Sequence, residues 1–275
     1  MSKGFIAATL LLVMVSSCSR VEPPPTRPVP RQYLLVADPA SAPLLRALTR
    51  QYSTAHPHLI FVIDVGDPVF IESRLKSART ALGATTSIPA QPAPGVKWWL
   101  ADLAMDGIAV VVNRQNPVSE LAVSDVRAIF AGERNAWADY GAPGLGDIKV
   151  AVRDSGDTTR TLFDSVVMGD LRLTLEAVIM PTPETMLSYI ALNPGAIGYA
   201  PAAFLAQSDL SVKPLALNGK LPTPENIAEG QYPMVSAVYL IAAREPQDEL
   251  REFVRWALSA EGRRLAQTLG YATLP

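Results

Sequence analysis

The feature that most constrains the fold is the alternation of short apolar runs with longer amphipathic segments. Runs that fit strands occupy residues 33–37, 59–63, 98–103, 107–112, 149–152 and 234–242. Segments with helical spacing of apolar residues occupy residues 43–53, 69–82, 125–131, 158–168, 184–192, 247–258 and 260–269. Ser124 is the expected N-cap of the third helix, and Gly270 the expected stop of the last. Such alternation predicts an α/β protein with mainly parallel sheets.

The composition supports a large buried core. Hydrophobic residues make up 49% of the chain and charged residues 18%. Residues 32–275 are long enough for one large domain or two small ones. The net charge is −2 and no basic block or basic–aromatic stripe occurs, so we expect no nucleic-acid partner. No internal repeat is present, and we expect a monomer.

The N-terminus has the parts of a secretory signal. Lys3 is the only charge before Arg20, and residues 5–15 form an apolar run too short to cross a bilayer as a mature helix. The run ends in Val15-Ser16-Ser17-Cys18, which resembles the lipobox of bacterial lipoproteins. This predicts a signal peptide at residues 1–17 and a lipidated Cys18; the alternative is an ordinary signal with an incidental cysteine. Because Cys18 is the only cysteine, no internal disulfide can form.

Five prolines within residues 23–30 follow the predicted lipid attachment site. Such a stretch favours extended polyproline geometry, so residues 18–31 are interpreted as a semi-rigid tether. The membrane contact is then through the lipid alone, on the periplasmic side of a bacterial membrane. Ser19 is not the Asp that resembles an inner-membrane retention signal, so sorting to an outer membrane is compatible with the sequence.

Residues for catalysis are scarce. His56 and His58 are the only histidines, and both lie in one turn, where a solvated turn is favoured over a metal site. Without a further histidine a Ser-His-Asp or Cys-His nucleophile is hard to assemble. No Gly-x-Ser-x-Gly elbow, Walker loop or Rossmann glycine pattern is present. We therefore expect no enzyme activity, no metal and no cofactor.

The strongest polar constellation lies between a predicted strand and a predicted helix. A helix start offers free backbone N–H groups and a positive dipole end, which together favour an oxyanion. The candidate ligand-binding residues here are Arg153, Ser155, Gly156, Asp157, Thr158, Thr159 and Arg160. The residues alone leave a second interpretation open, a capped helix whose Asp and Arg side chains pair with each other.

An ordered series of motifs runs over about 130 residues. It comprises Asp106-Gly107-Ile108-Ala109-Val110-Val111-Val112-Asn113, the helix at 125–132, the loop at 153–160, Pro194-Gly195-Ala196-Ile197-Gly198-Tyr199, Val212-Lys213-Pro214-Leu215, Pro222-Thr223-Pro224-Glu225-Asn226-Ile227 and Gly230-Gln231-Tyr232-Pro233. Each piece is weak, but their order resembles the periplasmic phosphate-binding proteins, the substrate-binding subunits of phosphate ABC transporters.

This resemblance implies a two-lobed α/β periplasmic-binding-protein (type II) fold with two crossover strands. Lobe one would comprise residues 32–105 plus 235–275, and lobe two residues 106–234. Hinges would lie near residues 107–112 and 232–238. The resemblance also implies phosphate or a related oxyanion as the ligand between the lobes, and an ABC permease as a partner that reads the closed form.

The sequence departs from the family in lobe one. The first glycine-serine loop of the family reads Ala37-Asp38-Pro39-Ala40-Ser41 here, with Asp38 and Ser41 as the remaining candidates for ligand contact. The second reads Val65-Gly66-Asp67-Pro68, and the family's Asp and Ser-Arg are replaced by Ala84-Thr85-Thr86-Ser87.

Three functions stay open on the sequence. The first is a solute-binding protein that delivers phosphate or a related oxyanion to an ABC importer. The second is a lipoprotein that uses the same fold as a sensor or partner-binding module, with a different ligand or no anion ligand. The third, a phosphohydrolase, lacks a recognisable metal site or nucleophile.

Overall fold

The computed structural model describes residues 29–77, 80–91, 93–95 and 97–274. The predicted signal peptide (1–17), Cys18 and most of the tether (18–31) therefore lie outside the described residues. The first described strand, β1, begins at Arg31, where the predicted tether ends.

The strands are β1 (Arg31–Ala37), β2 (Leu59–Val65), β3 (Thr80–Thr85), β4 (Trp99–Asn113), β5 (Glu120–Leu121), β6 (Lys149–Arg153), β7 (Val178–Met180), β8 (Ala196–Pro201), β9 (Val212–Pro214), β10 (Ala216–Leu217) and β11 (Val235–Ala242). The helices are α1 (Ala42–Ala55), α2 (Pro68–Lys76), α3 (Val123–Phe130), α4 (Thr158–Phe163), α5 (Pro183–Leu192), α6 (Ala202–Ala206), α7 (Pro224–Ala228), α8 (Asp248–Ala257) and α9 (Ala260–Thr268). Two 3₁₀ turns, η1 (Trp137–Tyr140) and η2 (Pro143–Leu145), and a wider helical turn, η3 (Asp164–Met168), complete the described elements.

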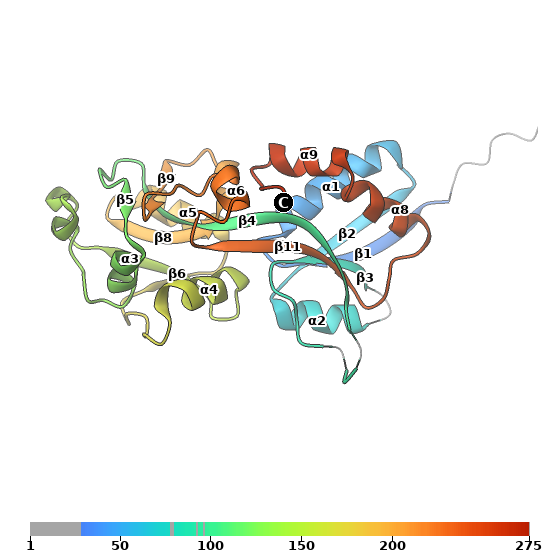
Figure 1. Ribbon diagram of the computed structural model, residues 1–275, viewed down its shortest axis with the longest axis horizontal. Helices are drawn as coiled ribbons and strands as arrows, with labels where there is room; N and C mark the ends of the chain where they lie inside the picture. Colours follow the sequence, from blue (N-terminus) through green and yellow to red (C-terminus); the bar gives the residue numbers. More distant parts are fainter. Residues whose placement is uncertain (1–28, 78–79, 92, 96, 275) are drawn as a thin grey trace, which may run out of the picture.

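Nine of the described strands pair across the molecule in the order β2-β1-β3-β11-β4-β8-β6-β7, with β9 also on β4. The pairs of β1 with β2 and β3, and of β6 with β7 and β8, are parallel. The centre is antiparallel, because β11 pairs with β3 and β4, and β4 pairs with β8. The predicted mainly parallel arrangement thus holds for the outer strands and is wrong for the centre, where β4 and β11 run side by side (Figure 1).

Strand β4 belongs to both halves of the molecule. Residues 99–107 pair with β11, and residues 108–112 pair with β8. The sequence predicted two strands here, 98–103 and 107–112, and this is wrong: the backbone at 104–106 keeps its pairing with β11. Gly107 fits the middle of the strand because an added Cβ would lie 2.9 Å from Ile227 and 3.3 Å from the Met234 carbonyl.

Two hydrophobic cores lie on either side of this shared strand. One is built by β1, β3, β11 and the helices α1, α8 and α9, and includes Leu35, Leu44, Leu45, Leu48, Tyr52, Leu82, Leu240 and Phe253. The other is built by the second half of β4 with β6, β8, α3, α4 and α5, and includes Val110, Phe130, Trp137, Phe163, Met186, Ile190 and Tyr199. Burial of each such side chain contributes about 1.5–3 kcal/mol. We use lobe one for the part around the first core and lobe two for the part around the second. The lobe boundaries implied by the resemblance stay a prediction, since Ala203 packs in the first core and Ala272 in the second.

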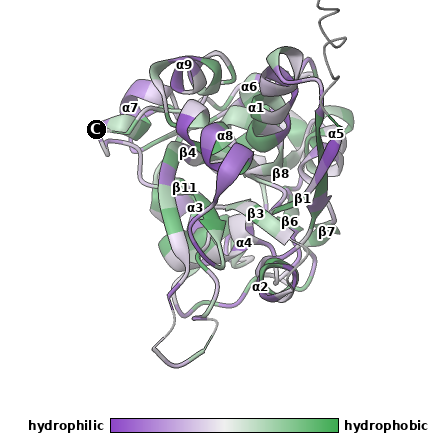
Figure 2. Cartoon of the chain, turned by 90° about the vertical axis from the view of Figure 1, so that its right-hand side faces the viewer, coloured by the Kyte–Doolittle hydropathy of each residue, from purple (hydrophilic) through white to green (hydrophobic). Residues whose placement is uncertain are grey.

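Most helices match their sequence patterns. In α1 the predicted face of Leu44, Leu45, Leu48 and Tyr52 is buried. Helix α8 buries Leu250, Phe253, Val254 and Ala257, and its hydrophilic outer face is seen in purple in Figure 2. Gly270, with φ at 87°, follows the end of α9 as expected.

Two helix boundaries differ from the prediction. The helix expected over 69–82 ends at Lys76, because residues 80–85 pair with β1 and β11 as strand β3. Helix α3 begins at Val123, so Ser124 lies in its first turn and is not the N-cap. The Asp125 carboxylate instead accepts from the N–H of Ala122 at 3.0 Å.

Candidate functional site

The loop from Arg153 to Arg160 connects β6 to α4, as the sequence predicted. Asp157 is the N-cap of α4, and its Oδ1 accepts from the N–H groups of Thr159 (3.0 Å) and Arg160 (3.2 Å). The helix start thus has a negative group of its own. The backbone donors that an external oxyanion would use at these two residues are bound to the Asp157 carboxylate.

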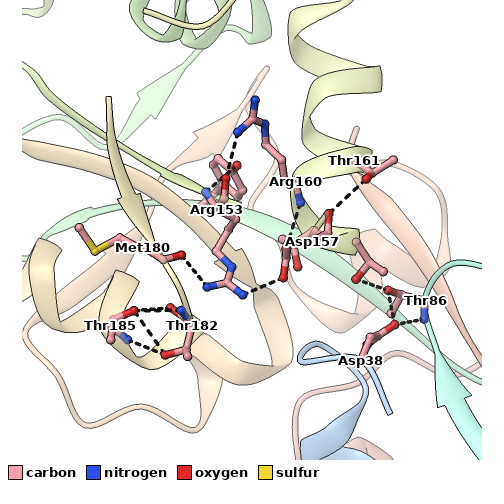
Figure 3. A network of polar contacts seen from close by, with 12 residues as sticks. Asp38, Thr86, Arg153, Asp157, Arg160, Thr161, Met180, Thr182 and Thr185 are labelled. Atoms are coloured by element: carbon pink, nitrogen blue, oxygen red, sulfur yellow. Dashed lines mark hydrogen bonds and ion pairs between the residues drawn. The ribbon is translucent and has the colours of Figure 1, made fainter. Parts of the chain in front are cut away.

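Arg153 is buried and points away from solvent, with 2% of its surface exposed. Its Nη2 donates to Asp157 Oδ2 at 2.7 Å, and its Nη1 donates to the Met180 carbonyl at 2.8 Å (Figure 3). These contacts match the second interpretation of the sequence, a capped helix with an internal Asp–Arg pair. Among the described residues the Nε of Arg153 has no hydrogen-bond partner, so the N–H of this nitrogen is unused.

An aromatic stack fixes the backbone at Arg153. The ring of Tyr199 stacks on Phe163 with a centroid separation of 4.1 Å, and Phe130 packs against Phe163 at 4.7 Å. The Tyr199 hydroxyl accepts from the N–H of Arg153 at 3.1 Å. Burial raises the pKa of Tyr199, so its hydroxyl stays neutral. The core of lobe two therefore positions the start of the loop.

The remaining loop residues differ in their exposure to solvent. Ser155 and Gly156 are exposed, whereas Thr158 and Thr159 are buried at the start of α4. Arg160 is half-buried; it donates to Asp164 at 2.7 Å and to the Arg153 carbonyl at 2.9 Å. Its guanidinium therefore links the start of the loop, at Arg153, to Asp164 at the end of α4.

In lobe one, Asp38 is the centre of a buried hydrogen-bond network. Its carboxylate accepts from the N–H groups of Ser41 (2.7 Å) and Thr86 (2.6 Å), and from the hydroxyls of Thr85 and Thr86 at 3.0 Å each. The Ser41 hydroxyl donates to the Ala84 carbonyl at 2.7 Å. Burial raises the pKa of Asp38 although these donors oppose the shift. Asp38 and Ser41 thus join β1 to the end of β3.

The two loops meet through a pair of threonines. The Thr86 hydroxyl lies 2.9 Å from the Thr158 hydroxyl, in a hydrogen bond between residues that are 72 positions apart in the chain. Because Thr86 also contacts Asp38, a continuous chain of hydrogen bonds runs from the β1–α1 loop to the start of α4 (Figure 3). This is the contact that brings the predicted residues of both lobes together.

A small cavity lies beside this threonine pair. Its polar lining comes from Thr86, Asp106, Thr158, Thr159 and Ser236, so hydroxyls from both sides of the molecule face it. Its volume is about 10 Å³, close to the minimum for one water molecule. A tetrahedral oxyanion needs more room than that, so the two sides must separate to admit one.

Asp106 is a functional candidate that the sequence analysis did not select. It lies in β4 and is 3% exposed, and its Oδ1 accepts from the N–H groups of Gly107 (2.7 Å) and Ala203 (3.0 Å). Burial raises the pKa of its carboxyl from 3.8 to about 7. The available signal was one acid inside the otherwise apolar segment 103–112. Thr86 was missed too, because its segment was interpreted as a loss of ligand residues.

Residues 25–261 match the family described as the PBP superfamily domain. The chain belongs to the PBP superfamily.

Individual relatives agree with this PBP-superfamily assignment. The chain is 27% identical over 161 residues to the phosphate-binding protein PstS of Bacillus subtilis, covering 58% of this chain and 52% of the relative. It is 26% identical over 204 residues to PstS of Pseudomonas aeruginosa strain PAO1, covering 66% and 62%. The aligned part therefore spans less than two thirds of these curated relatives. They are named as binding proteins, in agreement with the expectation of a non-enzymatic protein.

Solved structures show the same fold. A protein from Clostridium perfringens, assigned to a phosphate ABC transporter as its substrate-binding protein and solved with bound phosphate, has a TM-score of 0.80 at 22% identity. It covers 89% of this chain and 100% of that one. An ABC-type phosphate transport receptor from Vibrio cholerae has a TM-score of 0.69 at 24% identity, covering 88% and 99%. The expected periplasmic-binding-protein fold is confirmed.

Aspartates stand before three helices of this PBP-superfamily protein. Asp157 caps α4, Asp67 caps α2 by accepting from Phe70 N–H at 2.7 Å, and Asp38 accepts from Ser41 N–H directly before α1. Asp67 also faces the other lobe, since a Cβ added at Gly156 would lie 3.7 Å from its Oδ2. The acids that mark the departure from the family pattern in lobe one thus have structural roles.

The two histidines do not form a second candidate site among the described residues. His56 contacts the Tyr52 carbonyl, and His58 lies 3.5 Å from Glu249. Within the described ranges, no three His, Cys, Asp or Glu side chains gather as a metal site would require. A helix with the length and apolarity needed to cross a bilayer is likewise missing from the part of the chain that the structure describes.

The buried pair of Arg153 and Asp157 generates a stability prediction. Arg153→Ala leaves the Asp157 carboxylate buried without its cation, so we expect a loss of about 3–5 kcal/mol in the free energy of unfolding. Arg255→Ala, which removes an exposed pair with Glu252, should cost at most about 1 kcal/mol. Urea titrations of both variants measure this. Equal effects of the two substitutions would contradict the predicted role of the buried pair.

The raised pKa of Asp106 generates a pH prediction. Between pH 3.8 and about 7 the folded protein keeps a proton on Asp106 that the unfolded chain releases, so stability falls as the pH rises through this window. We expect Asp106→Asn to remove this slope, with a growing difference of ~1.4 kcal/mol per pKa unit. Denaturant titrations across the window measure it. Asp102→Asn, on an exposed residue of the same strand, should leave the slope unchanged; parallel curves for wild type and Asp106→Asn would refute the assignment.

Proposed function

We propose that the chain is an exported solute-binding protein of an ABC importer, with phosphate or a related oxyanion as its ligand. The observation that carries this proposal is the convergence of hydroxyls from both lobes on one interlobe cavity: Thr86 and Ser236 from one side, Thr158 and Thr159 from the other. The relatives that are named as phosphate-binding proteins supply the ligand class.

The chemistry of the cavity suits a small ligand rich in oxygen. Each threonine or serine hydroxyl can donate one hydrogen bond and accept others. Thr159 is 4% exposed, and its hydroxyl has no partner among the described hydrogen bonds, so it is free for a ligand. The Nε of Arg153 is a further unused donor behind the same loop.

Ligand entry requires a motion of the two lobes. The interlobe cavity has a volume of about 10 Å³, so the described arrangement of the lobes corresponds to a closed state. Hinge bending along β4 and the start of β11, the strands shared by the two halves, would break the hydrogen bond between Thr86 and Thr158 and open the cavity. An importer that binds the closed form selectively would then distinguish the ligand-bound protein from the ligand-free protein.

The lipid anchor is part of the proposal. Cleavage before Cys18 and lipidation of its thiol would attach the protein to a bacterial membrane on the periplasmic side. The proline-rich segment to residue 31 would then connect the lipid to β1. Because residue 19 is Ser and not the Asp of an inner-membrane retention signal, sorting to an outer membrane is compatible with the sequence. At the outer membrane the protein could not readily pass a ligand to a permease in the inner membrane.

A second candidate function is a sensor or partner-binding module on the same fold. The observation that favours it is the occupation of helix N-terminal N–H groups by the carboxylates of Asp67 and Asp157. These internal acids reduce the number of donors left for an external anion and place negative charge near it. Absence of anion binding, combined with a partner recovered by affinity purification, would favour this function over transport.

Thr159 provides a direct test of phosphate binding. We expect isothermal titration calorimetry on the purified protein to detect phosphate, and Thr159→Val to weaken it about 10- to 100-fold, because a hydrogen bond to a charged ligand contributes about 1.5–3 kcal/mol. Thr268→Val, at the far end of α9 with its hydroxyl on the Leu265 carbonyl, should have no effect. No heat from phosphate, arsenate or sulfate at about millimolar concentration would reject the proposed ligand class.

The anchor is tested by changing the cysteine. We expect the wild-type protein in the membrane fraction and the Cys18→Ser variant in the soluble periplasmic or secreted fraction, because only the thiol can carry the lipid. Ser17→Ala is the matched control, since it keeps both the cysteine and a small residue at the cleavage site. Equal membrane association of wild type and Cys18→Ser would contradict lipid anchoring.

A further inference from the structure

Strand β2 forms an open edge of the central sheet. It pairs with β1 on one side, and among the described strands none pairs with its other side. The opposite end of the sheet is β7, which has three residues, whereas β2 has seven. Proteins usually shorten such edges or place prolines and charges on them, because a long free edge is a template for a further strand. Strand β2 contains no proline, and its one charged residue, Asp64, is paired with Arg74 at 2.6 Å.

The backbone of β2 directs half of its polar groups to this open edge. At one end of the pairing with β1, the Arg31 N–H donates to the His58 carbonyl at 2.8 Å. At the other end, the Gly66 N–H donates to the Ala37 carbonyl at 3.0 Å. Successive residues of a strand direct their backbone groups to opposite sides, so the even-numbered residues of β2 face β1. The residues whose N–H and C=O groups face the open edge are Phe61, Ile63 and Val65.

The side chains along this edge are apolar on both faces of the sheet. On one face Ile60 and Val62 are 47% and 38% exposed. On the other face Phe61 and Ile63 line a groove of about 320 Å³ between β2 and α1. Helix α1 lies beside β2 at one end of the molecule (Figure 1). The edge therefore offers apolar contact on both faces together with unpaired backbone groups.

The groove also carries positive charge. Arg46 and Arg50 are exposed residues of α1, one helical turn apart, and both line the groove. The ion pairs among the described residues involve other arginines than these two. The remaining lining residues, Thr49 and Ser53 among them, carry no negative charge. An occupant with carboxylates is therefore complementary to this groove.

We propose that the open edge of β2 binds an extended acidic segment of a partner protein, which adds to the sheet as a further strand beside β2. Strand addition satisfies the outward backbone groups of β2, and the side chains of the added strand provide specificity. This inference goes beyond the proposed function and does not depend on the ligand of the interlobe cleft.

The geometry specifies the pattern of the added segment. Residues two apart in a strand lie about 6.7 Å apart on one face, close to the rise of about 5.4 Å for one helical turn. Acidic side chains at every second residue would therefore meet Arg46 and Arg50. The residues between them would lie on the opposite face and pack against Ile60 and Val62, so they should be apolar.

The charges favour this occupant over two others. Two copies of the chain paired antiparallel through β2 would place their α1 helices on the same face of the joined sheet, where Arg46 and Arg50 of one copy would approach those of the other. The chain's own residues 18–30 contain five prolines, which have no N–H to donate. They also contain two arginines, Arg20 and Arg27, against one acid.

The test measures fluorescence anisotropy of a labelled peptide in which Glu and Val alternate, titrated with the purified full chain. We expect saturable binding to wild type. Arg46→Glu combined with Arg50→Glu should weaken it at least about tenfold, because attraction becomes repulsion. The matched control is Arg263→Glu combined with Arg264→Glu, two exposed arginines of α9. It makes the same change in net charge and should leave binding unchanged.

Further peptides keep the test independent of folding defects. A peptide with Lys in place of Glu should bind the Arg46→Glu, Arg50→Glu variant and not wild type, which a misfolded variant could not do. Strand pairing is tested by N-methylation of the Glu–Val peptide, either at every Glu or at every Val. Only one of these two sets of N–H groups can face β2, so one methylated peptide should lose binding and the other should keep it.

Several results would overturn the inference. No binding of the Glu–Val peptide by wild type would do so, and so would equal binding of both methylated peptides, because charge alone would then account for the contact. Self-association of the wild-type chain that the Glu–Val peptide does not displace would assign the edge to a second copy. Binding of phosphatidylglycerol vesicles through Arg46 and Arg50, without binding of the peptide, would assign the groove to a lipid surface.

Discussion

The pairing of β4 with β11 on one half and with β8 on the other is the interaction on which the rest of the structure depends. Each half of β4 joins a different core, so this strand connects the two cores through its backbone. The chain crosses between them again at the start of β11, where Met234 packs in one core and Val238 in the other. This pairing sets the loops after β1 and β3 against the start of α4. It also places Asp106 and Gly107 at the point where the strand passes from one core to the other.

The electrostatics of the cleft follow from where carboxylates lie. Asp157 neutralises Arg153 and takes two helix N–H groups, and Asp67 takes another before α2. A helix start that carries its own anion attracts an external one less, because both compete for the same donors and the same dipole end. The starts of α2 and α4 therefore offer fewer free N–H groups to an external anion than uncapped helix starts would.

The sequence predicted the loop of the candidate site but not its internal contacts. Helical spacing and turn residues located Arg153 to Arg160 between strand and helix correctly. The spacing could not decide whether the Asp157 side chain contacts a ligand or pairs with Arg153, because both arrangements use the same residues. Thr86 and Asp106 were missed since their significance comes from partners 72 and 97 residues away, Thr158 and Ala203. Such contacts have no local sequence signal.

By itself the sequence determined the elements whose pattern is local. These are the apolar strand at residues 33–37, the buried face of α1, the helical stop at Gly270 and the ordered motifs that mark the superfamily. Tertiary structure alone decided the rest. Residues 80–85 became a strand because β1 and β11 offered backbone partners, and β4 stayed continuous through Asp106 because β11 kept pairing. The meeting of Thr86 with Thr158 likewise depends on the tertiary fold. Local propensity fixes what a segment prefers, whereas burial and pairing across the chain decide which preference is realised.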